Sequence, residues 1–255
     1  FRDVALEVLS TPDPAACSGD DDELFHRDNG HPNTRALRKG LIDSLAMFGA
    51  LSQEFPGIPG QGLADGIVRR LLEGEGHVER WRSLAPWLEG LAEASPHQFL
   101  QTAESIPDNP DLVAALFHDG GRLSTSPHTH LLWAPELLAW SPQHLSRVLI
   151  LLGRLAEIDP GGQTANRPFA SITEILMPWC PGTTAVAAQR LAAFRHLAGK
   201  CPEVAWERGL SLLPAGQVMV LPTSKPRFRD WPVRGTVPAR PADHQPFVDG
   251  RMRRR

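Results

Sequence analysis

Residues 91–206 contain four stretches of one form: LAEASPHQFL (91–100), LAWSPQHLSRV (138–148), LAEIDPGG (155–162) and LAGKCPEVAW (197–206). In each, Leu-Ala stands near the end of an apolar helical pattern, and a proline follows three or four residues after the alanine. Proline fits the first position of a helix, because an N–H group there would have no intrahelical partner. The stretches therefore predict short helices joined by Xaa-Pro steps, in the manner of αα-hairpins.

Side chains just before these prolines have capping chemistry. Ser95 and Ser141 each precede a proline, and a serine in that place can cap the following helix. Ser95 and Gln98 also have the spacing of a capping box. Asp159-Pro160 is followed by Gly161-Gly162, which predicts a turn rather than a helix start.

The spacing of the joints predicts the fold class. Pro96 and Pro142 are 46 residues apart, which fits a helical-pair repeat, whereas Pro142 and Pro202 are 60 apart. We therefore predict an all-α fold, an irregular α-solenoid of helical hairpins of the HEAT, armadillo or TPR kind, over residues 78–213. A compact, irregular helical domain is the alternative. Within this core, 142–156 is the most apolar helix, and an apolar pattern over most of its circumference predicts burial on both sides.

Residues 1–77 predict a looser helical lead-in. Helices are expected over 1–10, 34–54 and 63–73, separated by loops. An acidic run at 20–23 has neither the alternating ligands nor the distal Glu of a calcium loop, and it is typical of a solvated loop. The helix over 34–54 has its apolar residues spaced for one face, namely Leu37, Leu41, Leu45 and Phe48.

Residues 214–255 differ from the rest of the chain. They contain seven prolines, and only 218–221 has the pattern of a strand. Residues 222–255 carry nine Lys or Arg against three Asp, whereas the remainder of the chain is acidic. Such a Pro-rich, basic tail cannot bury enough apolar surface to fold alone. We expect it to wrap the helical body through Phe228 and Trp231, or to lead to a further domain.

Composition places the chain among ordinary globular proteins. It has 255 residues, 42% of them hydrophobic and 22% charged. No apolar run approaches the length of about 20 residues that a membrane span needs, and no secretory signal is present. Three widely spaced cysteines do not suggest a disulfide framework, so a cytoplasmic location is expected. The chain opens on Phe1 within a helical pattern, which predicts a fragment of a longer protein.

Motifs for catalysis, cofactors and metals are weak. No P-loop or Gly-x-Ser-x-Gly motif is present, and the glycines at 60–66 follow no strand. His128 and His130 are two residues apart rather than four, so we expect them at a helix start as polar surface or capping groups. Cys180 is expected to be a buried, unreactive thiol. We predict no enzyme activity, no cofactor and no metal.

The candidate partner-binding residues lie in two segments. Residues 159–184 form a long insertion between two apolar helices, a natural place for a binding surface. The alternative is a structural plug in which Arg167 pairs with a helix C-terminus or a Glu, Ile172, Ile175 and Leu176 pack inward, and Trp179 fills a groove. The candidates in the insertion are Asn166, Arg167, Glu174 and Trp179, and those in the tail are Arg227, Arg229 and Trp231.

Five short stretches within residues 80–231 share a pattern with a known class of proteins: Leu132-Trp133-Ala134, Asp159 to Gly162, Asn166 to Pro168, Ile175 to Trp179 and Arg227 to Trp231. On these stretches, residues 80–231 resemble the helical C-terminal region of large bacterial proteins in which an NTPase module of the STAND type, or another effector, precedes a long helical region. Pro135 and Cys180 depart from that pattern, and no catalytic residue can be carried over. The resemblance implies a sensor or scaffold arm that receives a ligand or partner.

Three functional hypotheses follow. The leading one is a non-catalytic helical interaction or scaffold module that binds a protein partner or an upstream domain of the same chain. The second is an all-α enzyme domain with its site around 159–181 and the two histidines, in which Glu174 and Arg167 would converge with a histidine. The third is nucleic-acid contact through the basic tail, where Arg and Lys would pair with phosphates and the aromatic rings would stack on bases.

Overall fold

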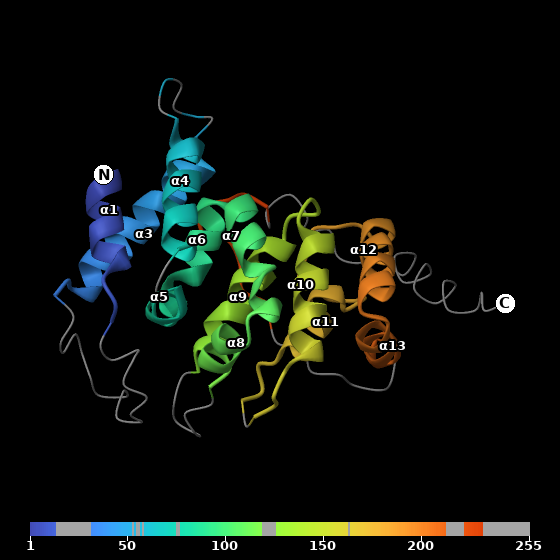
Figure 1. The fold of residues 1–255 in the computed structure, drawn as a ribbon. Coiled ribbons are helices and arrows are strands. Elements are labelled where there is room, and N and C mark those ends of the chain that lie inside the picture. Colours follow the sequence, from blue (N-terminus) through green and yellow to red (C-terminus); the bar gives the residue numbers. More distant parts are fainter. Residues whose placement is uncertain are drawn as a thin grey trace. The chain divides into compact units, whose positions relative to one another are not determined.

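The computed structural model is helical throughout the part of the chain that it describes (Figure 1). The described residues are 1–13, 32–52, 54, 57, 59–74, 77–118, 126–162, 164–212 and 222–231. The predicted acidic loop at 20–23, the predicted strand at 218–221 and the tail residues 232–255 lie outside these ranges. The all-α prediction is confirmed for the described residues, which contain helices and no strand.

The helices fall into two compact units. Unit 1 is Phe1–Ala134 with Pro160–Thr164, and unit 2 is Pro135–Asp159 with Ala165–Arg255. The boundary lies inside helix α9 (Pro127–Ala139), which continues through Pro135. The other helices of unit 1 are α1 (Arg2–Ser10), α3 (Arg35–Ala50), α4 (Gly60–Leu72), α5 (His77–Leu84), α6 (Leu88–Ala94), α7 (Pro96–Ala103) and α8 (Pro110–Leu116), with 3-10 turns η2 (Ala85–Trp87) and η3 (Ile106–Asp108).

Unit 1 is built around the close contact of α3 with α6. A Cβ atom at Gly49 would overlap the carbonyl oxygen of Ala94, so only glycine lets the two backbones approach this closely. The buried face of α3 is formed by Ile42, Leu45, Ala46 and Gly49. The predicted face is therefore partly wrong: Leu45 is buried, but Leu37 is exposed and Leu41 and Phe48 are half-buried. The small residues Ala46 and Gly49 determine which side of α3 packs.

The Xaa-Pro joint of unit 1 forms as predicted, but its capping does not. Helix α7 begins at Pro96 directly after α6 ends. The Ser95 side chain makes no cap hydrogen bond; its hydroxyl donates to Asp65 Oδ1 of α4 at 2.5 Å. A hydrogen bond to a carboxylate belongs to the stronger, charge-assisted class. The Ser95 hydroxyl is therefore held by this tertiary contact, and it accepts no hydrogen bond from the first N–H groups of α7.

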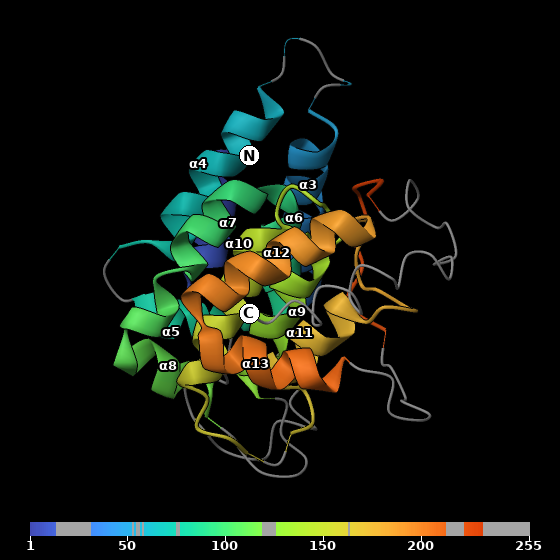
Figure 2. The ribbon, with the colours of Figure 1, turned by 90° about the vertical axis from the view of Figure 1, so that its right-hand side faces the viewer.

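Unit 2 contains the C-terminal part of α9 with α10 (Leu145–Glu157), α11 (Pro168–Leu176), α12 (Ala187–Lys200) and α13 (Pro202–Ser211). Helix α10 packs against α11, α12 and α13, and Figure 2 views this unit from the side on which α12 and α13 lie. The expected burial of α10 is confirmed, since Val148, Leu149, Leu151 and Leu152 are fully buried.

The start of α10 differs from its predicted position. The helix begins at Leu145 rather than at Pro142, and Ser141 is not its N-cap. Residues 142–144 form a turn in which the His144 N–H donates to the Ser141 carbonyl at 3.1 Å. The predicted turn at 159–162 is confirmed: it is not helical, and Gly161 has φ +77°. Helix α11 was not predicted as a separate element, although Pro168 at its first position is the same start signal as in α7 and α13.

Candidate functional site

The C-terminal segment 222–231 lies on unit 2 without regular structure, and we call it the anchored segment. Two hydrogen bonds hold its Ser224. The Trp140 indole N–H donates to the Ser224 carbonyl at 2.8 Å, and the Ser224 N–H donates to Glu136 Oε2 at 3.3 Å. Thr223 is 6% exposed and lies against Gly182, where a Cβ atom would be 2.6 Å from its side chain. Residues 223 and 224 of the tail thus contact unit 2, whereas the sequence predicts Phe228 and Trp231 as the contact residues.

Glu136 is the centre of a polar cluster that it forms with the Ser171 hydroxyl and the Ser224 N–H, and we call this cluster the polar interior. It stands in α9 and is 2% exposed. Besides the Ser224 N–H, its carboxylate accepts a hydrogen bond from the Ser171 hydroxyl of α11 at 2.6 Å. A buried carboxylate is tolerable only when such donors surround it. Glu136 therefore ties α9, α11 and the anchored segment together.

Glu174 lies one turn after Ser171 on α11. Burial, and in second place the charge of Glu136, raise the pKa of the Glu174 carboxyl to about 7. Its backbone carbonyl accepts the Gly182 N–H at 3.1 Å, which holds the loop after α11 in place. Glu174 is thus beside the polar interior and titrates near neutrality, instead of acting as an ordinary solvated carboxylate.

The anchored segment presents cations on aromatic rings. Lys225 Nζ lies 5.1 Å from the centre of the Trp140 ring. The guanidiniums of Arg227 and Arg229 lie 5.2 Å from the rings of Phe228 and Trp231, respectively. These distances are within the range of cation–π attraction. Lys225 and Arg227 are exposed, and Arg229 is half-buried.

Trp231 is held by a further ring contact. Its ring packs edge-on against His144, with centroids 5.7 Å apart. His144 belongs to the turn before α10, so the end of the anchored segment is fastened to a second point of unit 2. The candidates Arg227, Arg229 and Trp231 are therefore brought together on one fixed segment.

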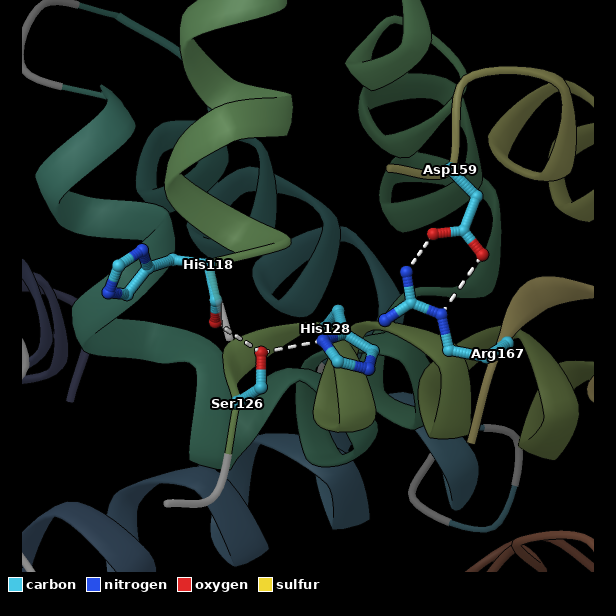
Figure 3. Close-up of polar contacts among 5 residues, drawn as sticks. All are labelled: His118, Ser126, His128, Asp159 and Arg167. Carbon is cyan, nitrogen blue, oxygen red and sulfur yellow. Dashed lines mark hydrogen bonds and ion pairs between the residues drawn. The ribbon is translucent and has the colours of Figure 1, made fainter. Parts of the chain in front are cut away.

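Arg167 and Asn166 lie at the other end of α11. Arg167 Nε donates to Asp159 Oδ2 at 3.0 Å, and its Nη2 pairs with Asp159 Oδ1, so the pair is bidentate (Figure 3). The Arg167 and Asp159 side chains are 13% and 9% exposed. The ion pair closes the loop between α10 and α11. The structural-plug alternative predicts a pairing of Arg167, but with a helix C-terminus or a Glu, and the observed partner is Asp159. Asn166 is half-buried beside it.

Trp179 does not fill a groove. It is 39% exposed in the loop between α11 and α12, whereas Ile172, Ile175 and Leu176 are fully buried as predicted. The groove-filling prediction is wrong because the apolar side of α11 already completes the core of this unit. Trp179 stays a candidate for partner contact.

The enzyme alternative finds no support in the placement of its residues. Arg167 starts α11 and Glu174 follows seven residues later, about 10 Å along the helix axis, and Arg167 is already paired with Asp159. Cys180 is exposed, contrary to the prediction of a buried thiol, whereas Cys201 is buried and its pKa is raised to about 11 by burial and then by Glu157. A thiol with such a pKa is a poor nucleophile.

His128 is buried, so its predicted place on the surface is wrong. The Ser126 hydroxyl donates to the His118 carbonyl at 2.6 Å and lies 2.6 Å from His128 Nδ1 (Figure 3). Because the serine proton is directed to a carbonyl, His128 Nδ1 is the donor to the serine oxygen. This order is the reverse of a nucleophile activated by a base. The His128 ring stacks on Phe117 at 5.5 Å.

Three residues of this region were missed as site residues from sequence: Glu136, Trp140 and His144. One signal for Glu136 was available, because it is a lone charge within the apolar run LLWAPELLAW at 131–140. A charged residue within such a run points to a buried, hydrogen-bonded group. Trp140 and His144 carried no comparable signal, since their partners are more than eighty residues away in sequence.

No protein-family model, curated protein or solved structure matches the chain. Within the described ranges, no three His, Cys, Asp or Glu side chains are grouped so that they could hold a metal ion. None of the helices described has both the length and the apolar character that a bilayer crossing requires.

Proposed function

We propose that the chain is a non-catalytic interaction module, an irregular solenoid of helical hairpins that serves as the sensor or regulatory arm of a larger protein. The helix pairs joined at Pro96 and Pro202 are consistent with hairpin units. Arrays of such units present extended surfaces that suit partner recognition. The partner is a protein segment rich in Asp or Glu.

The observation that carries the proposal is the row of cations on the anchored segment. Lys225, Arg227 and Arg229 alternate along the chain, and each is placed over an aromatic ring. A guanidinium over a ring loses less side-chain freedom on binding a carboxylate than one that moves freely. Because the segment is fastened through Ser224 and Trp231, this surface exists before a partner arrives.

The test measures binding of a fluorescein-labelled oligoglutamate peptide to the full chain by fluorescence anisotropy. The variant Lys225→Ala/Arg227→Ala/Arg229→Ala removes the cations. At about 0.5 kcal/mol for each solvent-exposed ion pair, binding should weaken by roughly tenfold. The matched control, Arg69→Ala/Arg70→Ala/Arg195→Ala, removes three exposed arginines outside the segment and should bind like the wild type.

Two outcomes would refute the proposal. The first is an equal loss of affinity in both triple variants, because the effect would then reflect net charge alone. The second is tighter binding of a labelled oligo-dT strand than of the oligoglutamate peptide, with the oligo-dT affinity lost in the first variant only. That result would assign the same surface to single-stranded nucleic acid.

A further inference from the structure

Among its described residues, unit 1 contains four buried side-chain nitrogen atoms that have no hydrogen-bond partner: Arg38 Nε, Arg82 Nε, Trp87 Nε1 and His130 Nδ1. Arg38 is 7% exposed and Trp87 is 9% exposed. Leaving a donor buried and unsatisfied costs about 1–3 kcal/mol, and more for a charged group. An arrangement that keeps such atoms unpaired needs an explanation.

Two of these atoms, Arg38 Nε and Trp87 Nε1, belong to side chains that contact each other. The guanidiniums of Arg35 and Arg38 each lie 5.8 Å from the centre of the Trp87 ring. Both arginines come from the first turn of α3, three residues apart and therefore on the same side of the helix. Thr34 fixes this turn, because its hydroxyl accepts the Leu37 N–H at 3.2 Å.

The three side chains of this cluster differ in solvent exposure. Arg35 is exposed, whereas Arg38 and Trp87 are buried. Positive potential at the N-terminus of α3 adds to the two guanidinium charges. The cluster therefore combines an accessible cation with buried, unused N–H donors.

Arg38 already binds one carboxylate. Its Nη1 lies 2.8 Å from Asp13 Oδ2, and the Asp13 N–H donates to Ser83 Oγ at 2.8 Å. Asp13 thus occupies one side of the guanidinium and leaves Nε unsatisfied. A guanidinium has a fork of donors that can serve a second oxyanion.

His130 adds no positive charge to the cluster. Burial, and then the charge of Arg35, lower the pKa of its imidazole, which favours the neutral ring. Its ring packs edge-on against Trp133 at 5.0 Å.

We propose that Arg35, Arg38 and the indole N–H of Trp87 form a binding site for the oxyanion of a small molecule, a carboxylate or a phosphate. Arg35 attracts the anion at the rim. Arg38 Nε and Trp87 Nε1 donate the hydrogen bonds that fix it. Charge-assisted bonds of this kind are the strong class, and they satisfy the atoms that are otherwise unpaired.

The experiment is an NMR titration of the ¹⁵N-labelled full chain with inorganic phosphate and, separately, with acetate, at constant ionic strength. Trp87→Phe identifies the Trp87 indole signal by its loss. We expect this signal to shift on titration with at least one probe. A shift with phosphate alone assigns a phosphate ligand, and a shift with acetate alone assigns a carboxylate ligand.

Variants of the donors and of Asp13 should change the affinity for the probe in opposite directions. Trp87→Phe keeps the ring under the guanidiniums but removes the donor, and Arg38→Lys keeps the charge but removes Nε. Each should weaken probe binding by about tenfold, the effect of losing one hydrogen bond to a charged group. Asp13→Asn removes the competing carboxylate charge and should tighten binding. Arg69→Gln, an exposed charge on α4, is the control and should change little.

Three results would each overturn the proposal. They are no probe binding at millimolar concentration, a Trp87 indole signal that does not move while others do, and equal affinities in the wild type, Trp87→Phe and Arg38→Lys. Native amide spectra of the variants show whether each is folded, so a loss of binding through unfolding is recognised.

Discussion

At Glu174, the protein environment raises the pKa of a carboxyl group into the neutral range. Its pKa is raised from 4.5 to about 7, first by burial and then by Glu136. Between these two values the folded state binds more protons than the unfolded state, so the stability of the fold decreases as pH rises through this window. The favourable contribution is complete below about pH 4.5 and lost above about pH 7.

Glu174→Gln should therefore remove the loss of folding stability that accompanies ionisation of this carboxyl group. Near pH 8 we expect the variant to be more stable than the wild type by about 1 kcal/mol, a value reduced for solvent screening because Glu174 is only half-buried. Near pH 5 the two should differ little. Urea midpoints at both pH values measure this. Glu203→Gln, an exposed change in the same unit, is the control, and parallel pH profiles for Glu174→Gln and the wild type would contradict the assignment.

Residue-level prediction succeeded where the side chain acts locally and failed where its partner is distant. The inward packing of Ile172, Ile175 and Leu176, which the structural-plug alternative predicts, is confirmed. Ser95 has local capping chemistry, yet it bonds to Asp65, thirty residues away. Spacing along the chain contains no information about such a partner.

Among the elements, α3 shows how one small residue positions a helix. Gly49 of α3 lies where a Cβ atom would overlap the backbone of Ala94 in α6. Because the overlapping atom is a backbone carbonyl, it cannot move aside like the end of a flexible side chain. The depth of the α3–α6 contact therefore depends on the missing side chain at this position.

Gly49→Ala should destabilise unit 1 by about 1–3 kcal/mol through overpacking. Gly40→Ala is a matched control on the same helix, because nothing lies within 4 Å of a Cβ atom there. The control should be more stable than the wild type by about 0.5–1 kcal/mol, the helix propensity difference between alanine and glycine. Thermal and urea unfolding measure both variants. A Gly49→Ala protein as stable as Gly40→Ala would show that the helices separate easily.

On the scale of the whole molecule, the anchored segment links distant parts of the sequence. Ser224 bonds to Glu136 and Trp140, 88 and 84 residues away. Without it, the second oxygen of Glu136 and the Trp140 indole would lose these partners. The anchored segment is thus part of the folded unit 2, although it has no regular secondary structure.

A chain ending at residue 221 should therefore be less stable in unit 2 than a chain ending at 231. Each buried polar group left unpaired costs about 1–3 kcal/mol. Hydrogen exchange should be faster in α11 and in the loop 177–184 of the shorter chain, with α3 and α6 of unit 1 as the internal reference. Equal exchange in the two chains would mean that the segment only rests on the surface.

The sequence by itself determined the helical class and the Xaa-Pro joints at Pro96 and Pro202, because helical periodicity and proline at the first helical position are local effects. Tertiary structure alone decided which face of α3 is buried, which residue Ser95 bonds to, and that Glu136 holds the anchored segment. It also gathered Arg35, Arg38 and Trp87 into one cluster. These features depend on contacts between residues far apart in the chain, and the free energy of such contacts is defined only once the helices have packed.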